Sequence, residues 1–210
     1  MNTPDKYIWT KKEGLEYRTF CTCRNGEIWN VPCENISTLS GRADGIKSQY
    51  SNFGFLVRYE GNSFNRGLAI WKELQSYLGK GKVTVELLEE FLTGSNIVKD
   101  NSSLHTSWLP EGDYFYSPIE NVLGKTLTAD LKDGLSHLVK EYPDFIDYET
   151  YCLFPAIEGF GYYPNINNEL LLRNENIWFT GDVVGNFRGI VPAFISGYVA
   201  GLSITSQIAY

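Results

Sequence analysis

Residues 177–201 read IWFTGDVVGNFRGIVPAFISGYVAG, and this stretch decides the fold of the C-terminal part of the chain. It begins with apolar residues that favour a β-strand, continues with a glycine-rich turn, and ends in an apolar run that predicts a helix from about Gly189 to Ile208. A strand, a bare turn and a helix N-terminus in this order bring backbone N–H groups to a place that a ligand can reach. We therefore expect a ligand site at the turn.

The residue types in this turn suit a cofactor that carries hydroxyl groups and an electron-rich carbonyl or phosphate. Gly181, Gly185 and Gly189 allow the backbone to come close to a ligand, because a side chain at these positions would fill the space. Asp182 ends the strand, and its carboxylate can accept hydrogen bonds from sugar or ribityl hydroxyls. The helix that follows directs free N–H groups and the positive end of its dipole at the turn.

The N-terminal part of the chain is rich in aromatic and β-branched residues, which favour strands. Asn25-Gly26 lies between two such runs and predicts a β-hairpin turn. Residues 37–52 are rich in Ser, Gly and Asn, which predicts a loop. The strands expected in this part are Lys6–Thr10, Glu16–Thr22, Glu27–Val31 and Phe53–Tyr59.

The middle of the chain has apolar residues three or four positions apart, and this period predicts helices. We expect them over residues 62–78, Val85–Leu92 and Thr126–Tyr142, with a long connection over residues 96–118. Short strand-like pieces follow at Tyr151–Ile157, Leu170–Leu172 and Ile177–Phe179. The prediction is an α+β fold with a β-rich N-terminal portion and central helices. Residues 1–145 form one portion and residues 146–210 a second, packed as one unit.

Composition and charge exclude some classes of function. The chain has 210 residues and a formal net charge of -7, and it has no cluster of the Lys and Arg residues from which nucleic-acid binding draws its affinity. The apolar C-terminal run is broken by Pro192, Ser196, Gly197 and Gly201, and the N-terminus has no apolar signal-peptide core. We therefore expect a cytoplasmic protein that binds neither nucleic acid nor a membrane.

The four cysteines are too few for a disulfide scaffold in a chain of this length. The two histidines, His105 and His137, lie far apart in the sequence, so no familiar metal-ligand spacing is present. Cys21 and Cys23 form the one close pair, and at positions i and i+2 of a strand their thiols would project side by side. A redox or metal role and simple burial both stay open for this pair, which supplies the only candidate catalytic residues.

Residues 179–201 resemble the C-terminal FAD segment of flavoproteins with the glutathione-reductase-like two-dinucleotide-binding fold, in which an apolar strand leads into G-[DE]-x-x-G and a small-residue helix. Within that group the chain looks most like the uncharacterised FAD-dependent dehydrogenases, whose C-terminal pattern is close to Y-P-x-G-E-G-A-G-Y-A-G-G-I. Residues 18–27, RTFCTCRNGE, resemble the R-T-F-C-M-C-P-G-G segment of the same family. Asp182 stands where the family has Glu, and Asn186-Phe187-Arg188 replaces a run of smaller residues.

The resemblance implies that the cofactor is FAD. It implies that Asp182 contacts the ribityl chain and that Gly189, Ile190 and Val191 supply amides near the C2 carbonyl of the isoalloxazine ring. Arg188 would meet a phosphate or a substrate carboxylate, or it would lie on the surface, and both readings stay open. The cofactor-binding residues expected from the turn and the resemblance together are Gly181, Asp182, Gly185, Arg188, Gly189, Ile190 and Val191.

The family holds the adenine and the pyrophosphate with a first βαβ unit that bears G-x-G-x-x-G. These 210 residues contain no such fingerprint, and Gly79-Lys80-Gly81 lacks the third glycine. The resemblance therefore implies part of an FAD-dependent oxidoreductase that transfers hydride to or from a small-molecule substrate, completed by a separate N-terminal FAD-binding chain or by a homodimer. The alternative is a non-catalytic module that has lost the flavin and binds a small molecule or a protein.

Overall fold

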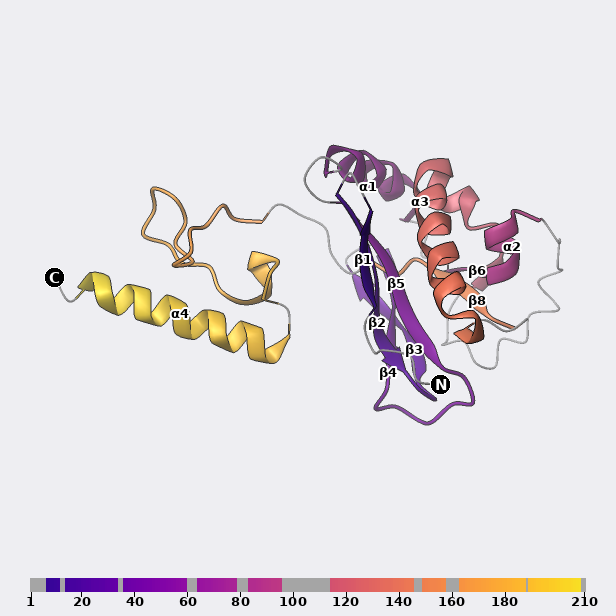
Figure 1. The fold of residues 1–210 in the computed structure, drawn as a ribbon, viewed down its shortest axis with the longest axis horizontal. Helices are drawn as coiled ribbons and strands as arrows, with labels where there is room; N and C mark the ends of the chain where they lie inside the picture. The colour runs from indigo at the N-terminus through magenta and orange to yellow at the C-terminus, as the bar shows by residue number, and fades with distance from the viewer. Residues whose placement is uncertain are drawn as a thin grey trace. The chain divides into compact units, whose positions relative to one another are not determined.

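The computed structural model describes residues 7–11, 14–33, 36–59, 64–78, 83–95, 114–145, 149–157, 163–187 and 189–208. The chain divides into two compact units, residues 1–158 and residues 159–210. The boundary predicted after residue 145 lies earlier in the sequence than this division after residue 158. Strands and helices are mixed in the described part of the chain (Figure 1), so the α+β fold class expected from the sequence is confirmed.

The first unit contains small sheets of short strands. Their orders are β1-β2-β5, β3-β4 and β7-β6-β8. The pairing is antiparallel between these neighbours except for β6 and β7, which are parallel. The strands are β1 (Ile8–Lys11), β2 (Leu15–Cys23), β3 (Glu27–Cys33), β4 (Ile36–Arg42), β5 (Asn52–Tyr59), β6 (Val83–Leu87), β7 (Tyr114–Tyr116) and β8 (Tyr151–Phe154).

Three α-helices of the first unit enclose its main apolar core. They are α1 (Phe64–Leu78), α2 (Leu88–Thr93) and α3 (Glu120–Glu141), and the 3-10 helix η4 (Pro143–Phe145) follows α3. The regular apolar spacing that predicted α1 and most of α3 supplies the side chains of this core. Its buried members are Ile70, Leu74, Leu88, Phe91, Ile119, Leu123, Leu127, Leu135 and Leu138.

The predicted hairpin around Asn25-Gly26 is wrong, although the turn is present. β2 pairs with β1 and β5, whereas β3 pairs with β4, so the turn passes the chain from one sheet to another. Asn25 adopts a φ of 53° and bonds the distant loop after β4: its side-chain amide donates to the Ser48 carbonyl at 2.9 Å. Gly26 leaves no space for a side chain, because an added Cβ would lie 2.7 Å from the Arg42 carbonyl oxygen.

Two other expectations are corrected by strand pairing. Residues 83–87, of which 85–87 were expected to be helical, form the buried strand β6, and the helix α2 begins only at Leu88. The loop expected over residues 37–52 contains most of β4, which finds its partner in β3. The partners of β6, namely β7 and β8, are distant in the sequence, whereas β4 pairs with β3, the strand directly before it. The Ser and Gly content of β4 concealed this strand, because pairing and packing outweigh local propensity.

The helix α3 lies against β2 and β5 at Gly134, where its backbone contacts aromatic rings. A Cβ at this position would lie 2.6 Å from Cε1 of Tyr17 and 2.9 Å from Cζ of Phe55. The Tyr17 hydroxyl donates to Asp133 at 3.2 Å, and the Tyr59 hydroxyl donates to Asp130 at 2.7 Å. The glycine therefore allows α3 to approach the sheet closely enough for these two hydrogen bonds.

The N-terminus of α3 is held by a buried carboxylate. Glu86 on β6 is 6% exposed, and its Oε2 accepts the backbone N–H of Ile119 at 2.7 Å. Burial raises the pKa of Glu86 from its ordinary value of 4.5, while the hydrogen bond from Ile119 and the charge of Lys132 oppose the shift. Because burial is the largest cause, the charged form is disfavoured in the folded protein.

The second unit consists of an irregular segment followed by one long helix. The two strands expected at Leu170–Leu172 and Ile177–Phe179 are reduced to isolated bridges, Ile166 with Leu172 and Leu171 with Trp178. The 3-10 helix η5 (Gly181–Val184) then leads to α4 (Ile190–Ile208), which confirms the predicted C-terminal helix.

A methyl group added at Gly134 is expected to destabilise the first unit. Gly134→Ala must displace the buried ring of Tyr17, which costs about 1–3 kcal/mol of unfolding free energy in a packed core. The measurement is urea unfolding followed by far-UV circular dichroism. Gly201→Ala on α4 is the matched control: nothing lies within 4 Å of its added Cβ, and Ala is a better helix former than Gly by roughly 1 kcal/mol. Equal effects of the two substitutions would contradict the packing at Gly134.

The raised pKa of Glu86 makes a signed prediction about pH. The contribution of Glu86 to the free energy of unfolding is fully present below its ordinary pKa of 4.5. This contribution is lost as the pH rises through the higher pKa of the folded state. Glu86→Gln keeps an acceptor for Ile119 and does not ionise, so its stability relative to wild type is expected to increase as the pH rises from about 4 to about 7. Urea unfolding at both pH values gives the unfolding free energy of the variant minus that of the wild type. A value that falls as the pH rises would refute the raised pKa of Glu86.

Candidate functional site

The turn between Phe179 and α4 has the backbone form that its glycines predict. Gly181, Gly185 and Gly189 have φ values of 74°, 82° and 94°, in the left-handed region that disfavours residues with a side chain. The N–H of Gly185 donates to the Asp182 carbonyl at 2.8 Å and closes the 3-10 turn of η5. The chain thus reverses direction over a few residues and enters α4.

The space around the three glycines differs from one to the next. An added Cβ at Gly181 meets only Ala193 at 3.9 Å, and one at Gly189 meets only Pro192 at 3.8 Å, so both backbones are open to a ligand. At Gly185 the Tyr163 ring fills the corresponding space, since an added Cβ would lie 2.6 Å from its Cε1. Gly181 and Gly189 are therefore accessible, whereas Gly185 is required for packing.

The exposed polar groups of the turn lie on both sides of the buried residue Val184. Asp182 is exposed, whereas Val184 is 4% exposed and anchors the turn. The first turn of α4 contains no acidic side chain, so the positive end of its dipole is not neutralised by its own residues. The predicted residue Arg188 lies outside the described residues.

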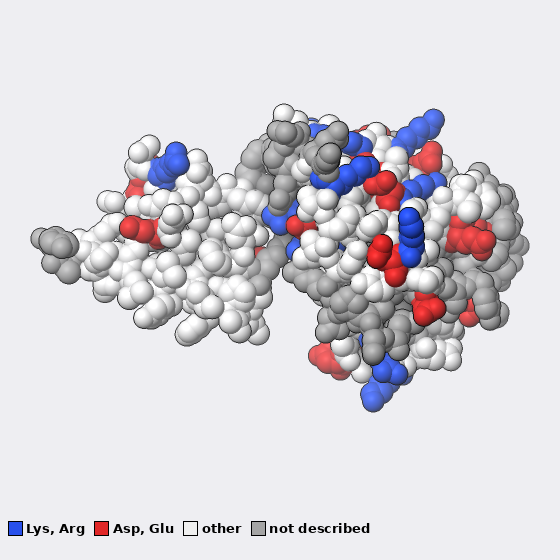
Figure 2. Space-filling view, in the orientation of Figure 1, with Lys and Arg blue, Asp and Glu red and all other residues white. Residues whose placement is uncertain are grey.

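The helix α4 is apolar on the side that it exposes. It contains no charged residue, and Figure 2 shows an uncharged surface along it. Ser196, Ala200 and Ser203 on its inner side are 0%, 3% and 7% exposed. The large side chains on its outer side that remain exposed are Ile190, Val191, Phe194, Ile195, Tyr198 and Leu202.

The helix α4 continues past Pro192, Gly197 and Gly201, as predicted, and these residues interrupt only its apolar composition. By length and composition α4 is long and apolar enough to cross a membrane, since its window Ile190–Gln207 spans 18 residues with a mean hydropathy of 1.2. Only 17% of that window is buried in the structure. The window is weakly apolar, and no other described helix qualifies.

The two candidate catalytic thiols are not equivalent. A register irregularity between Phe20 and Cys23 interrupts the pairing of β2, and Cys21 within it adopts a φ of 49°. Cys21 is exposed, whereas Cys23 is 4% exposed and its thiol donates to the Cys21 carbonyl at 3.2 Å. Burial raises the pKa of Cys23, which disfavours its thiolate. The two thiols were expected to project side by side from a regular strand, but the register irregularity interrupts that strand and leaves one thiol exposed and the other buried.

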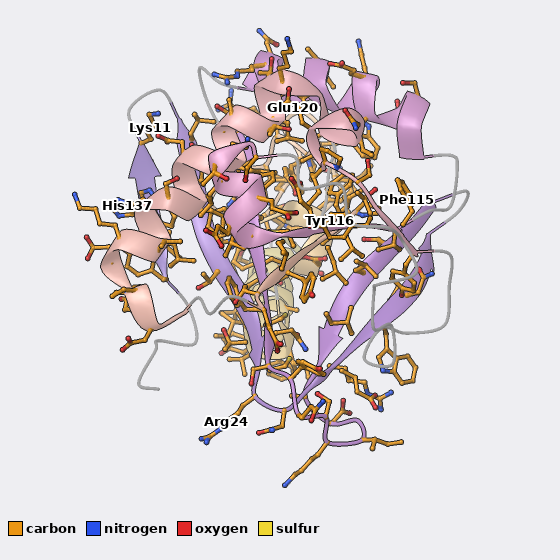
Figure 3. The ribbon with its side chains drawn as sticks, turned by 90° about the vertical axis from the view of Figure 1, so that its right-hand side faces the viewer. Lys11, Arg24, Phe115, Tyr116, Glu120 and His137 are labelled. Carbon is orange, nitrogen blue, oxygen red and sulfur yellow. The ribbon has the colours of Figure 1, made fainter. Side chains whose placement is uncertain are left out.

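Tyr7 and His137, two other titratable residues of the first unit, pack together with Trp9. The Tyr7 hydroxyl lies 3.2 Å from Nε2 of His137, and the rings of Trp9 and His137 are 4.8 Å apart. Figure 3 shows His137 and Lys11 on the side of α3 and β1, away from Arg24 at the turn after β2. Among the described residues, no three His, Cys, Asp or Glu side chains come close enough to hold a metal ion.

Two residues of the site were missed by sequence reasoning. Ser196 Oγ accepts the N–H of Gly181 at 2.8 Å and so joins α4 to the turn. Tyr163 packs on Gly185, as described above. A serine within a small-residue helix has no distinctive spacing, and Tyr163 lies in an irregular segment, so neither gave a sequence signal.

The chain matches no known protein-family model, and no curated protein matches it either.

The exposure of the cysteines predicts their order of alkylation. With iodoacetamide and the native protein, Cys21 is expected to react well before Cys23 and Cys152, because burial raises the pKa of both latter thiols, that of Cys152 to about 12. Peptide mapping by mass spectrometry assigns the modified residue at each time. Cys21→Ser removes the early product without changing the rates at the other two thiols. Early labelling of Cys23 would contradict its burial.

Proposed function

We propose that this chain supplies the flavin-facing half of an FAD site in an oxidoreductase. The observation that carries the proposal is the open backbone at Gly181 and Gly189 on the two sides of exposed Asp182. A flat, polar cofactor needs such an approach, and few packing roles leave two left-handed glycines uncovered. The resemblance of the same residues to the C-terminal FAD segment supports the proposal independently of their geometry.

Each polar group of the site has a role in this proposal. The carboxylate of Asp182 accepts hydrogen bonds from the ribityl hydroxyls. The amides of Gly189, Ile190 and Val191 stabilise negative charge at the C2 carbonyl of the ring, because they stand at the positive end of α4. Bound FAD supplies hydride transfer, and the protein supplies position and electrostatics.

The proposal requires a second FAD-binding unit. No described strand pairs with Ile177–Phe179 in a sheet, although the resemblance places a strand there. The outer side of α4 is also apolar and exposed, which is unusual for a helix that already has a packed inner side. We propose that the unit with the pyrophosphate-binding fingerprint, on a separate chain, covers both features.

The thiols support our proposal that the protein lies in the cytoplasm. Cys21, Cys23 and Cys152 are free, and two of them are at least partly buried in the fold. Free structural thiols persist in a reducing environment. We therefore place the protein in the cytoplasm.

A flavin series tests the proposal. Because the site contacts the ribityl chain and the ring but not the pyrophosphate, riboflavin, FMN and FAD are expected to bind the full chain with Kd values within about threefold of one another, a difference below 1 kcal/mol. Quenching of flavin fluorescence gives each Kd. A chain that binds none of the three is a module of another class, and strong preference for FAD would place the contacts elsewhere.

A carboxylate substitution locates the flavin on the turn. Asp182→Ala removes a charged acceptor, and hydrogen bonds to charged groups contribute about 1.5–3 kcal/mol, so riboflavin is expected to bind at least roughly tenfold more weakly. Glu175→Ala is the matched control, because Glu175 is an exposed carboxylate in the same unit. Equal loss of affinity in both variants would indicate a non-specific charge effect.

A further inference from the structure

We infer that Ser196 is the positioning residue that holds the turn between Gly181 and Gly189 in the form that binds flavin, an inference that rests on the function proposed above. Ser196 lies on the inner side of α4 and is 0% exposed. Its hydroxyl accepts a hydrogen bond from the backbone of this turn. Its role is to act through the backbone, not to touch the cofactor.

The hydroxyl of Ser196 is the centre of a hydrogen-bond chain. Its Oγ accepts the N–H of Gly181 at 2.8 Å and donates to the Ala193 carbonyl at 2.6 Å. The N–H of Ala193 in turn donates to the Gly189 carbonyl at 3.0 Å. A serine hydroxyl can donate and accept at the same time, so one side chain ties the first glycine of the turn to the last.

Side-chain packing beside the Cα of Gly181 is sparse in the described part of the chain, so the hydrogen bond to Ser196 is an important restraint on this residue. Its nearest potential contact is Ala193, at 3.9 Å from an added Cβ. The far side of the turn is held differently, by the Tyr163 ring on Gly185 and by buried Val184. Asp182 follows Gly181 directly, so the bond to Ser196 fixes the backbone of the ribityl-binding carboxylate relative to the amides at the start of α4.

A second serine on the same side of α4 provides a matched control. Ser203 is 7% exposed, and its Oγ accepts from Nε1 of Trp178 at 3.0 Å and donates to Glu169 at 3.4 Å. Like Ser196 it is buried and both accepts and donates a hydrogen bond, yet its partners are side chains outside the turn. Loss of a buried hydroxyl alone would affect both positions alike.

The experiment compares Ser196→Ala and Ser203→Ala in the full chain. For Ser196→Ala, riboflavin binding is expected to weaken roughly tenfold, because an unsatisfied buried N–H at Gly181 lets the turn move. For Ser203→Ala, the Kd is expected to stay within about twofold of wild type. Thermal unfolding of both variants reports how far each hydroxyl stabilises the fold.

Hydrogen exchange tests the contact without a variant. In the unliganded wild type, the Gly181 amide is expected to exchange more slowly than the exposed amides beside it, and an unprotected Gly181 would overturn the inference. If wild type binds riboflavin and Ser196→Ala binds it equally well, the inference fails and the proposed function stands. If wild type binds no flavin, both fail.

Discussion

Within each of the two units, aromatic rings pack directly on glycine backbone and bring neighbouring elements into contact. In the first unit such contacts bring α3 onto the β1-β2-β5 sheet and α1 onto β5, and in the second unit one closes the turn before α4. Each contact depends on a missing Cβ, because a side chain at the glycine would occupy the volume of the ring. The pairs are Tyr17 with Gly134, Tyr59 with Gly67, Phe20 with Gly54, and Tyr163 with Gly185.

The interactions that accompany these ring–glycine contacts differ between the two units. Tyr17 is 0% exposed, and both it and Tyr59 donate their hydroxyls to aspartates of α3, so ring packing and hydrogen bonding act together. Burial raises the pKa of both tyrosines and keeps the hydroxyls protonated as donors. Tyr163 is 47% exposed and packs within a unit whose apolar core is small. The second unit consequently depends more on backbone turns and on the hydrogen bonds of Ser196 and Ser203.

Local signals could be predicted from the sequence, and non-local partners could not. The helices α1, α3 and α4 follow from apolar periodicity and from their glycine and proline boundaries, which act within a few residues. The Asn25-Gly26 turn was also predicted, but its bonds to Ser48 and Ser51 send β3 to another partner. At the site, the open glycines and Asp182 were identified from their types alone. Ser196 was not identified, because its role depends on which backbone N–H donates to its hydroxyl in the folded chain.

The exposed side of α4 connects the candidate site to the second FAD-binding unit that we propose. A helix of this length extends about 28 Å at 1.5 Å per residue, and a flavin on the turn reaches only its N-terminal end. Tyr198 and Leu202 lie beyond that end and are 64% and 54% exposed. Between them Gly201 has nothing within 4 Å of an added Cβ, a gap that accepts the backbone of another element. Contiguous exposed apolar surface of this kind often marks a place where another apolar surface binds. In the proposed arrangement, the cofactor and the covering unit would bind adjoining parts of one helix, and each would reduce the apolar surface that the other leaves exposed.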